Sequence, residues 1–225
     1  MNTNNAKRNA AKEAVKFVED GMIVGLGTGS TSRIAVDMIG KKLSQDFQIR
    51  GMPTSIETER QAENLGIKLI GIDETDCIDI AIDGADEVSP DLSLIKGLGG
   101  ALLREKKVEK KAKQLIIIVD EGKIVEKLGR GFLPIEININ EHEETCSKIK
   151  NLGCNAELRI ESSGEPFLTD NKNYIYHCLF ENGIEDPHNL DKSLLSIEGV
   201  KDTGLFLNMA NKIIIGNNNG FTILE

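Results

Sequence analysis

The chain has 225 residues, of which 40% are hydrophobic, and its formal net charge is -9 at pH 7. This length and apolar content suffice for one large domain or two modest ones. The acidic balance argues against nucleic acid or an anionic membrane as a partner. No apolar run approaches the roughly 20 residues that a membrane-spanning helix needs, and the N-terminal residues lack the apolar centre of a signal peptide. We therefore expect a soluble, cytoplasmic protein.

The cysteines and histidines show none of the spacings that commonly bind metals. Neither CxxC nor HxxxH occurs among the four cysteines and three histidines. The sequence therefore predicts reduced cysteines and no structural metal.

The first half of the chain alternates short apolar runs with segments of helical periodicity. Apolar spacing predicts a helix over 7–19, and a strand over 22–25 leads through a glycine turn, 25–32, into a second helix. Continuous apolar runs predict buried strands over 78–82 and 114–119. Strands that alternate with helices favour a Rossmann-like, mostly parallel sheet with helices on both faces. Further elements are expected at 47–52 (strand), 55–65 (helix), 67–70 (strand), 92–95 (apolar segment) and 101–113 (helix).

The pattern changes after Gly129. PIEINI at 134–139 alternates apolar and polar residues as a half-exposed strand does, and the elements from there follow the order βαββαβ of a ferredoxin-like unit. We predict a smaller ferredoxin-like α+β domain over 130–207, and a Rossmann-like catalytic domain over 1–129 and 208–225. Strands in the tail are expected to rejoin the first sheet. The expected elements are 134–139, 141–152, 157–160, 174–179, 189–197 and 201–207, with tail strands at 212–215 and 221–224.

The glycine turn GLGTGSTS at 25–32 leads from a strand into a helix start. Unpaired backbone N–H groups, the helix dipole and the hydroxyls of Thr28, Ser30 and Thr31 suit a phosphate there. The turn is not a dinucleotide fingerprint, because GxGxxG counted from Gly25 requires glycine at position 30, and it lacks the GK[ST] of a P-loop. A plain βα turn is the alternative, since glycine turns are common in such folds.

Two acids, Asp83 and Asp86, stand three residues apart directly after the predicted strand 78–82. Ligands of open α/β sheets bind at the carboxyl ends of strands. Carboxylates there can hold sugar hydroxyls, bind a cation or share a proton. The motif offers few ligands for a metal ion, because only Glu87 adds another acid. A solvated acidic turn is the alternative.

KGLGGALLREK at 96–106 adds a positive charge and a candidate base. Lys96 precedes three glycines that let the backbone approach a ligand closely, and Glu105 follows about one turn into the next helix. A carboxylate that is partly excluded from water and near other acids has the raised pKa that a general base needs. Glu105 also fits a solvated position on a charged helix, and Lys7 and Lys123 are surface lysines by default. Together the three loops describe a site for a small phosphorylated polyol.

These motifs resemble those of the type A ribose-5-phosphate isomerase family. GLGTGSTS, DGADE, KGLGGALLREK and the D-x-x-K pattern at 120–123 have that family's order and similar spacing. The resemblance implies reversible conversion of D-ribose 5-phosphate to D-ribulose 5-phosphate through an enediolate, with neither metal nor organic cofactor. It implies that Glu105 is the base and that Lys96 stabilises negative charge on the oxygen. It also implies that Asp83 and Asp86 hold hydroxyls and assist ring opening.

The resemblance further implies a set of substrate contacts and an oligomer. Family members are usually dimers or tetramers, so we expect a homodimer or homotetramer with a sugar phosphate as its partner. One residue departs from the family pattern, because Leu98 replaces a glycine of KGGG. A positive φ there would strain the loop by on the order of 1 kcal/mol or more, and we expect a conformation that leucine tolerates. The implied contacts are Thr28, Gly29, Ser30, Thr31, Asp83, Gly84, Ala85, Asp86, Lys96, Gly97, Leu98, Gly99, Lys123 and Lys7.

Two other functions compete with this one. Another sugar-phosphate enzyme, such as an amino-sugar phosphate deaminase or a lactonase, fits a similar sheet, although no histidine falls in the three loops to open a sugar ring. A sugar-phosphate sensor is the other alternative. That function would want a DNA-binding helix-turn-helix and a basic face, and the acidic chain shows neither.

Overall fold

A computed structural model describes residues 3–225, which form two compact units. Unit 1 comprises the residues up to Ala85 together with Arg104–Ile124 and Asn208–Glu225, and unit 2 comprises Asp86–Leu103 and Val125–Leu207. The boundaries expected from the sequence keep 86–103 and 125–129 in the first domain, whereas their packing places both segments in unit 2. Which parts fold independently remains a prediction.

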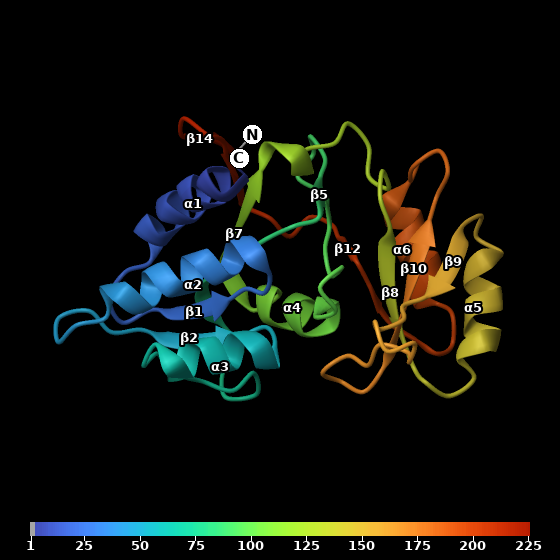
Figure 1. The fold of residues 1–225 in the computed structure, drawn as a ribbon, viewed down its shortest axis with the longest axis horizontal. Helices are drawn as coiled ribbons and strands as arrows, with labels where there is room; N and C mark the ends of the chain where they lie inside the picture. The colour runs from blue at the N-terminus through green and yellow to red at the C-terminus, as the bar shows by residue number, and fades with distance from the viewer. Residues whose placement is uncertain (1–2) are drawn as a thin grey trace. The chain divides into compact units, whose positions relative to one another are not determined.

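Unit 1 contains a seven-stranded sheet with the strand order β14-β13-β7-β4-β1-β2-β3, of which Figure 1 labels β14, β7, β1 and β2. Neighbouring strands pair in parallel, except β13 and β14, which pair antiparallel. The predicted parallel sheet is confirmed, and the tail rejoins it through β13, which pairs with β7. The strands are β1 (Ile23–Leu26), β2 (Arg50–Pro53), β3 (Lys68–Leu69), β4 (Ile78–Asp83), β7 (Ala112–Asp120), β13 (Lys212–Gly216) and β14 (Phe221–Leu224).

Helices pack on both faces of this sheet, as strand β1 shows. Side chains alternate between the faces of a strand, and Val24 and Leu26 enter the core that α1, α2 and α3 share. Gly25 faces the other side, where a Cβ would lie 2.8 Å from Ala81 Cβ and 3.0 Å from the Val108 side chain of α4. Only glycine lets α4 pack this closely on β1. The helices are α1 (Thr3–Ala14), η1 (Val15–Phe17), α2 (Ser30–Lys42), α3 (Ile56–Asn64), α4 (Leu102–Glu109) and η2 (Glu121–Lys123).

Helix α4 is shorter than the sequence predicts. The expected helix over 101–113 ends at Glu109, and β7 begins at Ala112. Ile78 of β4 pairs with Ala112, so strand pairing incorporates lysine-rich residues whose spacing favours a helix. Here tertiary pairing outweighs a weak local propensity.

Unit 2 contains a four-stranded antiparallel sheet with the order β11-β8-β10-β9. Its helices and strands follow the predicted chain order βαββαβ, which is confirmed. The core between sheet and helices includes Ile135, Ile149, Cys178 and Leu194. The elements are β8 (Leu133–Ile137), α5 (His142–Lys150), β9 (Asn155–Leu158), β10 (Tyr174–Leu179), α6 (Pro187–Leu195) and β11 (Val200–Thr203).

Strand β8 is buried along its whole length, so its predicted half-exposed character is wrong. Glu136 is 0% exposed, and its Oε1 accepts hydrogen bonds from Thr169 Oγ1 (3.0 Å), Asn171 Nδ2 (3.1 Å) and Asn173 Nδ2 (2.9 Å). These donors take the place of water. Burial nevertheless raises the pKa of the Glu136 carboxyl above its usual value.

A three-stranded sheet with the order β12-β6-β5 was not expected from the sequence. The predicted strand over 201–207 is divided at Gly204 into β11 and β12. The Gly204 N–H donates to Pro134 O (2.7 Å), and its carbonyl accepts from Lys96 N–H (2.9 Å). A Cβ at position 204 would lie 2.6 Å from Lys96 O, so glycine lets the chain pass from one sheet to the other. The strands are β5 (Glu87–Val88), β6 (Leu94–Ile95) and β12 (Leu205–Phe206).

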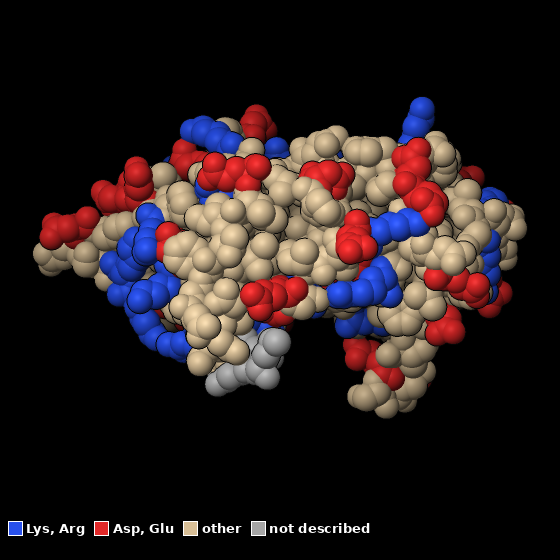
Figure 2. Space-filling view, turned by 90° about the horizontal axis from the view of Figure 1, so that it is seen from above, with Lys and Arg blue, Asp and Glu red and all other residues tan. Residues whose placement is uncertain are grey.

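The surface of the described chain offers no membrane span. No helix within residues 3–225 is long and apolar enough to cross a bilayer. On the face drawn in Figure 2, Lys and Arg side chains are interspersed with Asp and Glu. The charge on this face is therefore mixed in sign.

Candidate active site

Two glycines shape the turn between β1 and α2. A Cβ at Gly27 would lie 2.2 Å from the carboxylate oxygen Oδ1 of Asp83, so only glycine fits there. Gly29 has a φ of +107°, and α2 begins at the next residue, Ser30, without a side-chain cap. Gly29 and Ser30 are exposed. The turn therefore presents the first backbone N–H groups of α2 and the positive end of its dipole to solvent, as an anion site requires.

Lys7 of α1 lies at this helix start. Its ammonium Nζ donates to Ser30 Oγ over 2.9 Å, and its positive charge adds to the attraction of the helix dipole for an anion. Lys123, the other lysine implied by the resemblance, lies in η2 directly after β7, the strand that pairs with β4. The structure thus brings Lys7 and Ser30 together, while the contacts of both lysines with substrate remain predictions.

The side chain of Thr28 belongs to a hydroxyl cluster that the sequence reasoning missed. Thr28 Oγ1 lies 2.7 Å from Thr54 Oγ1, 2.8 Å from Ser55 Oγ and 3.1 Å from Thr58 Oγ1. Ser55 also caps α3, because its Oγ accepts from Thr58 N–H over 3.1 Å. The hydroxyl-rich TSIET that follows β2 is the signal that could have revealed the cluster. The cluster holds the turn in place, because the Thr28 hydroxyl is hydrogen-bonded to other side chains of the protein.

Asp83 ends β4 and is only 1% exposed. Its Oδ1 accepts from Thr28 N–H (2.9 Å), Ser32 Oγ (2.8 Å) and Gly84 N–H (2.7 Å). Three donors on one oxygen offset the desolvation of a buried carboxylate and fix its orientation. Asp83 therefore ties the end of β4 to the turn that follows the neighbouring strand β1. Gly84 and Ala85, which follow, are half-buried.

In unit 2, Asp86 and the glycine turn 97–100 form a second group. The turn is closed by a hydrogen bond from Gly100 N–H to Gly97 O (2.9 Å), and Asp86 Oδ2 accepts from Leu98 N–H (3.0 Å). Gly97 and Gly100 have φ angles of +92° and +100°, which side chains rarely adopt. Among the described residues, the non-glycine positions with positive φ do not include Leu98. The expectation that leucine is tolerated at position 98 is confirmed.

Lys96, in unit 2, and Glu105, in unit 1, are both buried. Lys96 is 2% exposed, and its Nζ lies 5.3 Å from the ring centroid of Phe206. Glu105 is 4% exposed and stands in the first turn of α4, where the helix dipole favours negative charge. The alternative that Glu105 is a solvated surface acid is wrong. Charged side chains are rarely buried so fully without a partner or a function.

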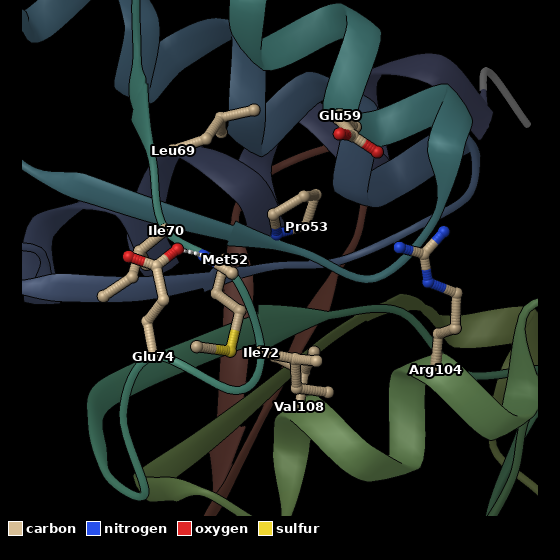
Figure 3. A pocket seen from close by; sticks show the side chains of 10 residues that line it. Met52, Pro53, Glu59, Leu69, Ile70, Ile72, Glu74, Arg104 and Val108 are labelled. Atoms are coloured by element: carbon tan, nitrogen blue, oxygen red, sulfur yellow. Dashed lines mark hydrogen bonds between the residues drawn. The ribbon is translucent and has the colours of Figure 1, made fainter.

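A pocket in unit 1 is lined by other residues (Figure 3). Its volume is about 230 Å³, with Met52, Ile72 and Val108 among its apolar lining and Glu59 and Arg104 projecting from α3 and α4. None of the residues predicted for the site lines this pocket. Within residues 3–225, no three His, Cys, Asp or Glu side chains are grouped as a metal site needs.

Unit 1 defines a class of protein. A parallel sheet whose first βα turn opens a helix N-terminus, with a buried acid at the end of the adjacent strand, is typical of α/β proteins that bind small phosphorylated molecules. Comparisons with known proteins identify the family. A family model described as ribose 5-phosphate isomerase A (phosphoriboisomerase A) matches residues 50–220. The chain belongs to the ribose 5-phosphate isomerase A family.

Individual relatives match along nearly their whole length. A ribose-5-phosphate isomerase A of Bacillus mycoides is 49% identical over 216 residues, which cover 96% of this chain and 97% of the relative. The solved ribose 5-phosphate isomerase A of Methanocaldococcus jannaschii has a TM-score of 0.94 at 35% identity and covers 99% of both chains. A solved D-ribose-5-phosphate isomerase in complex with phospho-erythronic acid has a TM-score of 0.94 at 38% identity and covers 100% of both chains.

Proposed function

We propose that the chain is a ribose-5-phosphate isomerase that interconverts D-ribose 5-phosphate and D-ribulose 5-phosphate. The observation that carries this proposal is the family match over residues 50–220, joined by 49% identity to an isomerase along 96% of the chain. A sugar-phosphate sensor and another sugar-phosphate enzyme, the alternatives raised by the sequence, are not favoured, because the relatives are isomerases that align over nearly their full length.

The reaction moves one proton between C2 and C1 of the open-chain sugar. A base takes the proton from C2, a C1–C2 double bond forms, and O1 of the former aldehyde gains the negative charge of an enediolate. The proton then returns at C1, while the hydroxyl proton passes from O2 to O1, which leaves the ketone at C2. Such a reaction needs a positioned base and a group that stabilises the charged oxygen.

We assign these roles to residues of the sequence motifs, of which Glu105, Lys96 and Asp83 are buried. Glu105 is the base, since its burial in the first turn of α4 keeps its carboxylate away from bulk water. Lys96, also buried, stabilises the charge on the enediolate oxygen. Asp83 and Asp86 hold substrate hydroxyls and assist ring opening. No metal or organic cofactor is proposed, because acid–base transfer and charge stabilisation suffice for this chemistry.

The phosphate is proposed to bind at the start of α2. Exposed backbone N–H groups at Gly29 and Ser30, with the Lys7 ammonium 2.9 Å from Ser30 Oγ, support this placement. A relative was solved with phospho-erythronic acid, and we propose that this chain binds the same sugar acid. The proposed substrate contacts are Thr28, Gly29, Ser30, Thr31, Asp83, Gly84, Ala85, Asp86, Lys96, Gly97, Leu98, Gly99, Lys123 and Lys7.

The cellular location, the pathway, the oligomeric state and the partners of the enzyme are proposed from the family resemblance and from the net charge. We place it in the cytoplasm, in the non-oxidative pentose phosphate pathway, as a homodimer or homotetramer. A net charge of -9 supports the absence of nucleic acid and anionic membrane among its partners.

Proton NMR of the purified, chelator-treated protein with ribose 5-phosphate in heavy water tests the function. We expect ribulose 5-phosphate to appear with solvent deuterium at C1, because the base exchanges its proton with solvent between the two transfers. Conversion without deuterium would keep the isomerase but require a shielded base or hydride transfer. Thermal protection by the sugar phosphate without any conversion would contradict the proposal and favour a sensor.

A further inference from the structure

Arg159 of unit 2 lies against the glycine turn 97–100, although no motif of the sequence includes it. Its guanidinium Nη1 donates a hydrogen bond to Leu98 O over 2.9 Å, across 61 positions of the chain. Its Cζ lies 3.6 Å from the ring centroid of Phe167, so the guanidinium stacks on that ring. The backbone holds both side chains in place, because Phe167 N–H donates to Arg159 O and Arg159 N–H donates to Ile175 O, each over 2.9 Å.

The turn packs directly on this pair of side chains. A Cβ at Gly100 would lie 2.5 Å from Phe167 Cζ and 3.0 Å from Arg159 Nη1. Gly100 also has a φ of +100°. Position 100 therefore accepts only glycine, and the backbone of the turn rests on the stacked guanidinium without an intervening side chain.

Two side chains fix the peptide groups on either side of Leu98. Asp86 accepts from its N–H over 3.0 Å, and Arg159 donates to its C=O over 2.9 Å. The C=O and N–H of one trans peptide group point in opposite directions. The bond from Arg159 to Leu98 O therefore directs the Gly99 N–H away from Arg159.

The Gly99 N–H is an open donor. Gly99 is exposed, and a Cβ at that position would meet no atom within 4 Å. No acceptor within residues 3–225 receives a hydrogen bond from its N–H. A backbone donor of fixed direction that no protein acceptor occupies is available to a developing oxyanion once bound substrate excludes water from it.

We propose that Arg159 is a positioning residue that directs the Gly99 N–H at the oxygen on which negative charge develops during isomerisation. The inference rests on the proposed function, in which Lys96 and residues 97–99 bind the sugar. A donor of fixed direction stabilises the charged enediolate more than the neutral sugar. Loss of its direction therefore lowers kcat more than it raises KM.

Two substitutions of Arg159 test this role by their split between kcat and KM. Arg159→Met keeps an unbranched apolar chain against Phe167 but donates no hydrogen bond, and we expect kcat to fall roughly 10-fold to 100-fold with KM within about 3-fold. Arg159→Lys keeps a positive donor, and we expect it to recover kcat to within roughly 5-fold of the wild type. Phe167→Leu is the matched control, because it removes the stacking and leaves the donor; its kcat should stay within about 3-fold.

Binding of phospho-erythronic acid gives a second reading of the same variants. Its carboxylate places negative oxygens next to the carbon chain, as the enediolate does. We expect Arg159→Met to raise its inhibition constant about as much as it lowers kcat/KM. An Arg159→Met enzyme with wild-type kcat, or with only a raised KM, would overturn the inference. If Arg159→Met does not fold, Arg159→Leu, which also donates no hydrogen bond, takes its place: a fall in kcat with KM within about 3-fold supports the role, and wild-type kcat or only a raised KM overturns it.

Two measurements distinguish failure of the proposed function from failure of the positioning role: turnover by the wild-type protein and NMR of the Gly99 amide. A wild-type protein that does not convert ribose 5-phosphate would contradict the proposed isomerase function. The positioning role is then read from the Gly99 amide resonance of the ¹⁵N-labelled protein titrated with phospho-erythronic acid. A ligand-induced shift in the wild type that is lost in Arg159→Met supports the role, and equal shifts, or none in the wild type, overturn it.

Discussion

The glycine turn after β1 and the glycine turn 97–100 are stabilised by different kinds of contact. In the turn after β1, Asp83 accepts from Thr28 N–H and Ser32 Oγ. In the turn 97–100, Asp86 accepts from Leu98 N–H, but the carbonyl of the same residue is held by Arg159. The first turn is thus fixed by Asp83 of a recognised motif and by the hydroxyl cluster around Thr28, whereas the second also depends on Arg159, which lies outside every motif.

The difference shows what residue types report about a site. Glycines and hydroxyls indicate where backbone can meet an anion, as in GLGTGSTS and KGLGG. They do not indicate what gives that backbone its direction, which depends on side chains that the fold brings near. A turn that looks complete in sequence can therefore still owe its geometry to a distant residue.

Glu105 lies outside both turns. Its replacement should cause the largest loss of kcat, against which the effects of changes in the two turns can be compared. We expect Glu105→Gln to lower kcat roughly 10²-fold to 10⁴-fold, because glutamine keeps the shape but cannot take the C2 proton. The NMR assay measures turnover, and the melting temperature should stay within about 5 °C of the wild type. Glu63→Gln, an exposed change on α3, is the control and should leave kcat unchanged. Near-wild-type turnover of Glu105→Gln would sink the base assignment and leave the turns as the main source of catalysis.

Replacement of Asp83 and replacement of Asp86 should lower the free energy of unfolding by different amounts. Asp83→Asn is expected to lower the free energy of unfolding by about 1–3 kcal/mol, because a buried carboxylate with three donors loses its charge. Asp86 is half-exposed and receives the Leu98 N–H, so Asp86→Asn should cost less than about 1 kcal/mol. Urea unfolding of both variants measures the difference. Equal losses would mean that Asp83 is no more an anchor of its turn than Asp86 is.

Leu98→Gly should have the smallest effect. Leu98 already sits in unstrained backbone, so glycine relieves nothing and loosens the unfolded chain, at a cost of roughly 0.5–1 kcal/mol. We expect kcat/KM within about 3-fold of the wild type. Gly97→Ala is the contrasting change in the same turn, because a Cβ there would lie 2.3 Å from Leu102 Cβ at a φ of +92°. A larger loss from Leu98→Gly than from Gly97→Ala would contradict this account of the turn.

Much of the fold follows from sequence periodicity, and the missing parts share a cause. The parallel sheet and the βαββαβ order are visible because each element carries its own pattern. The strand division at Gly204 and the hydroxyl cluster around Thr28 are not, because they depend on which strands become neighbours. The contact of Arg159 with Leu98 depends on the same information. The burial of Glu105 also had to come from packing, since its charged helix reads as solvent-exposed in sequence.

The strand order of unit 1 has a consequence for synthesis on the ribosome. Residues 115–119 of strand β7 are apolar and buried, and its partner β13 is translated only after the four-stranded sheet of unit 2, β8 to β11, has been made. Until then one edge of β7 is unpaired. Helix α1 also lacks part of its packing surface until β13 is made, because Gly216 of β13 packs against the Ala6 carbonyl. We therefore expect nascent chains that stop before Lys212 to be the aggregation-prone species of this protein, with unit 2 already folded and unit 1 still open.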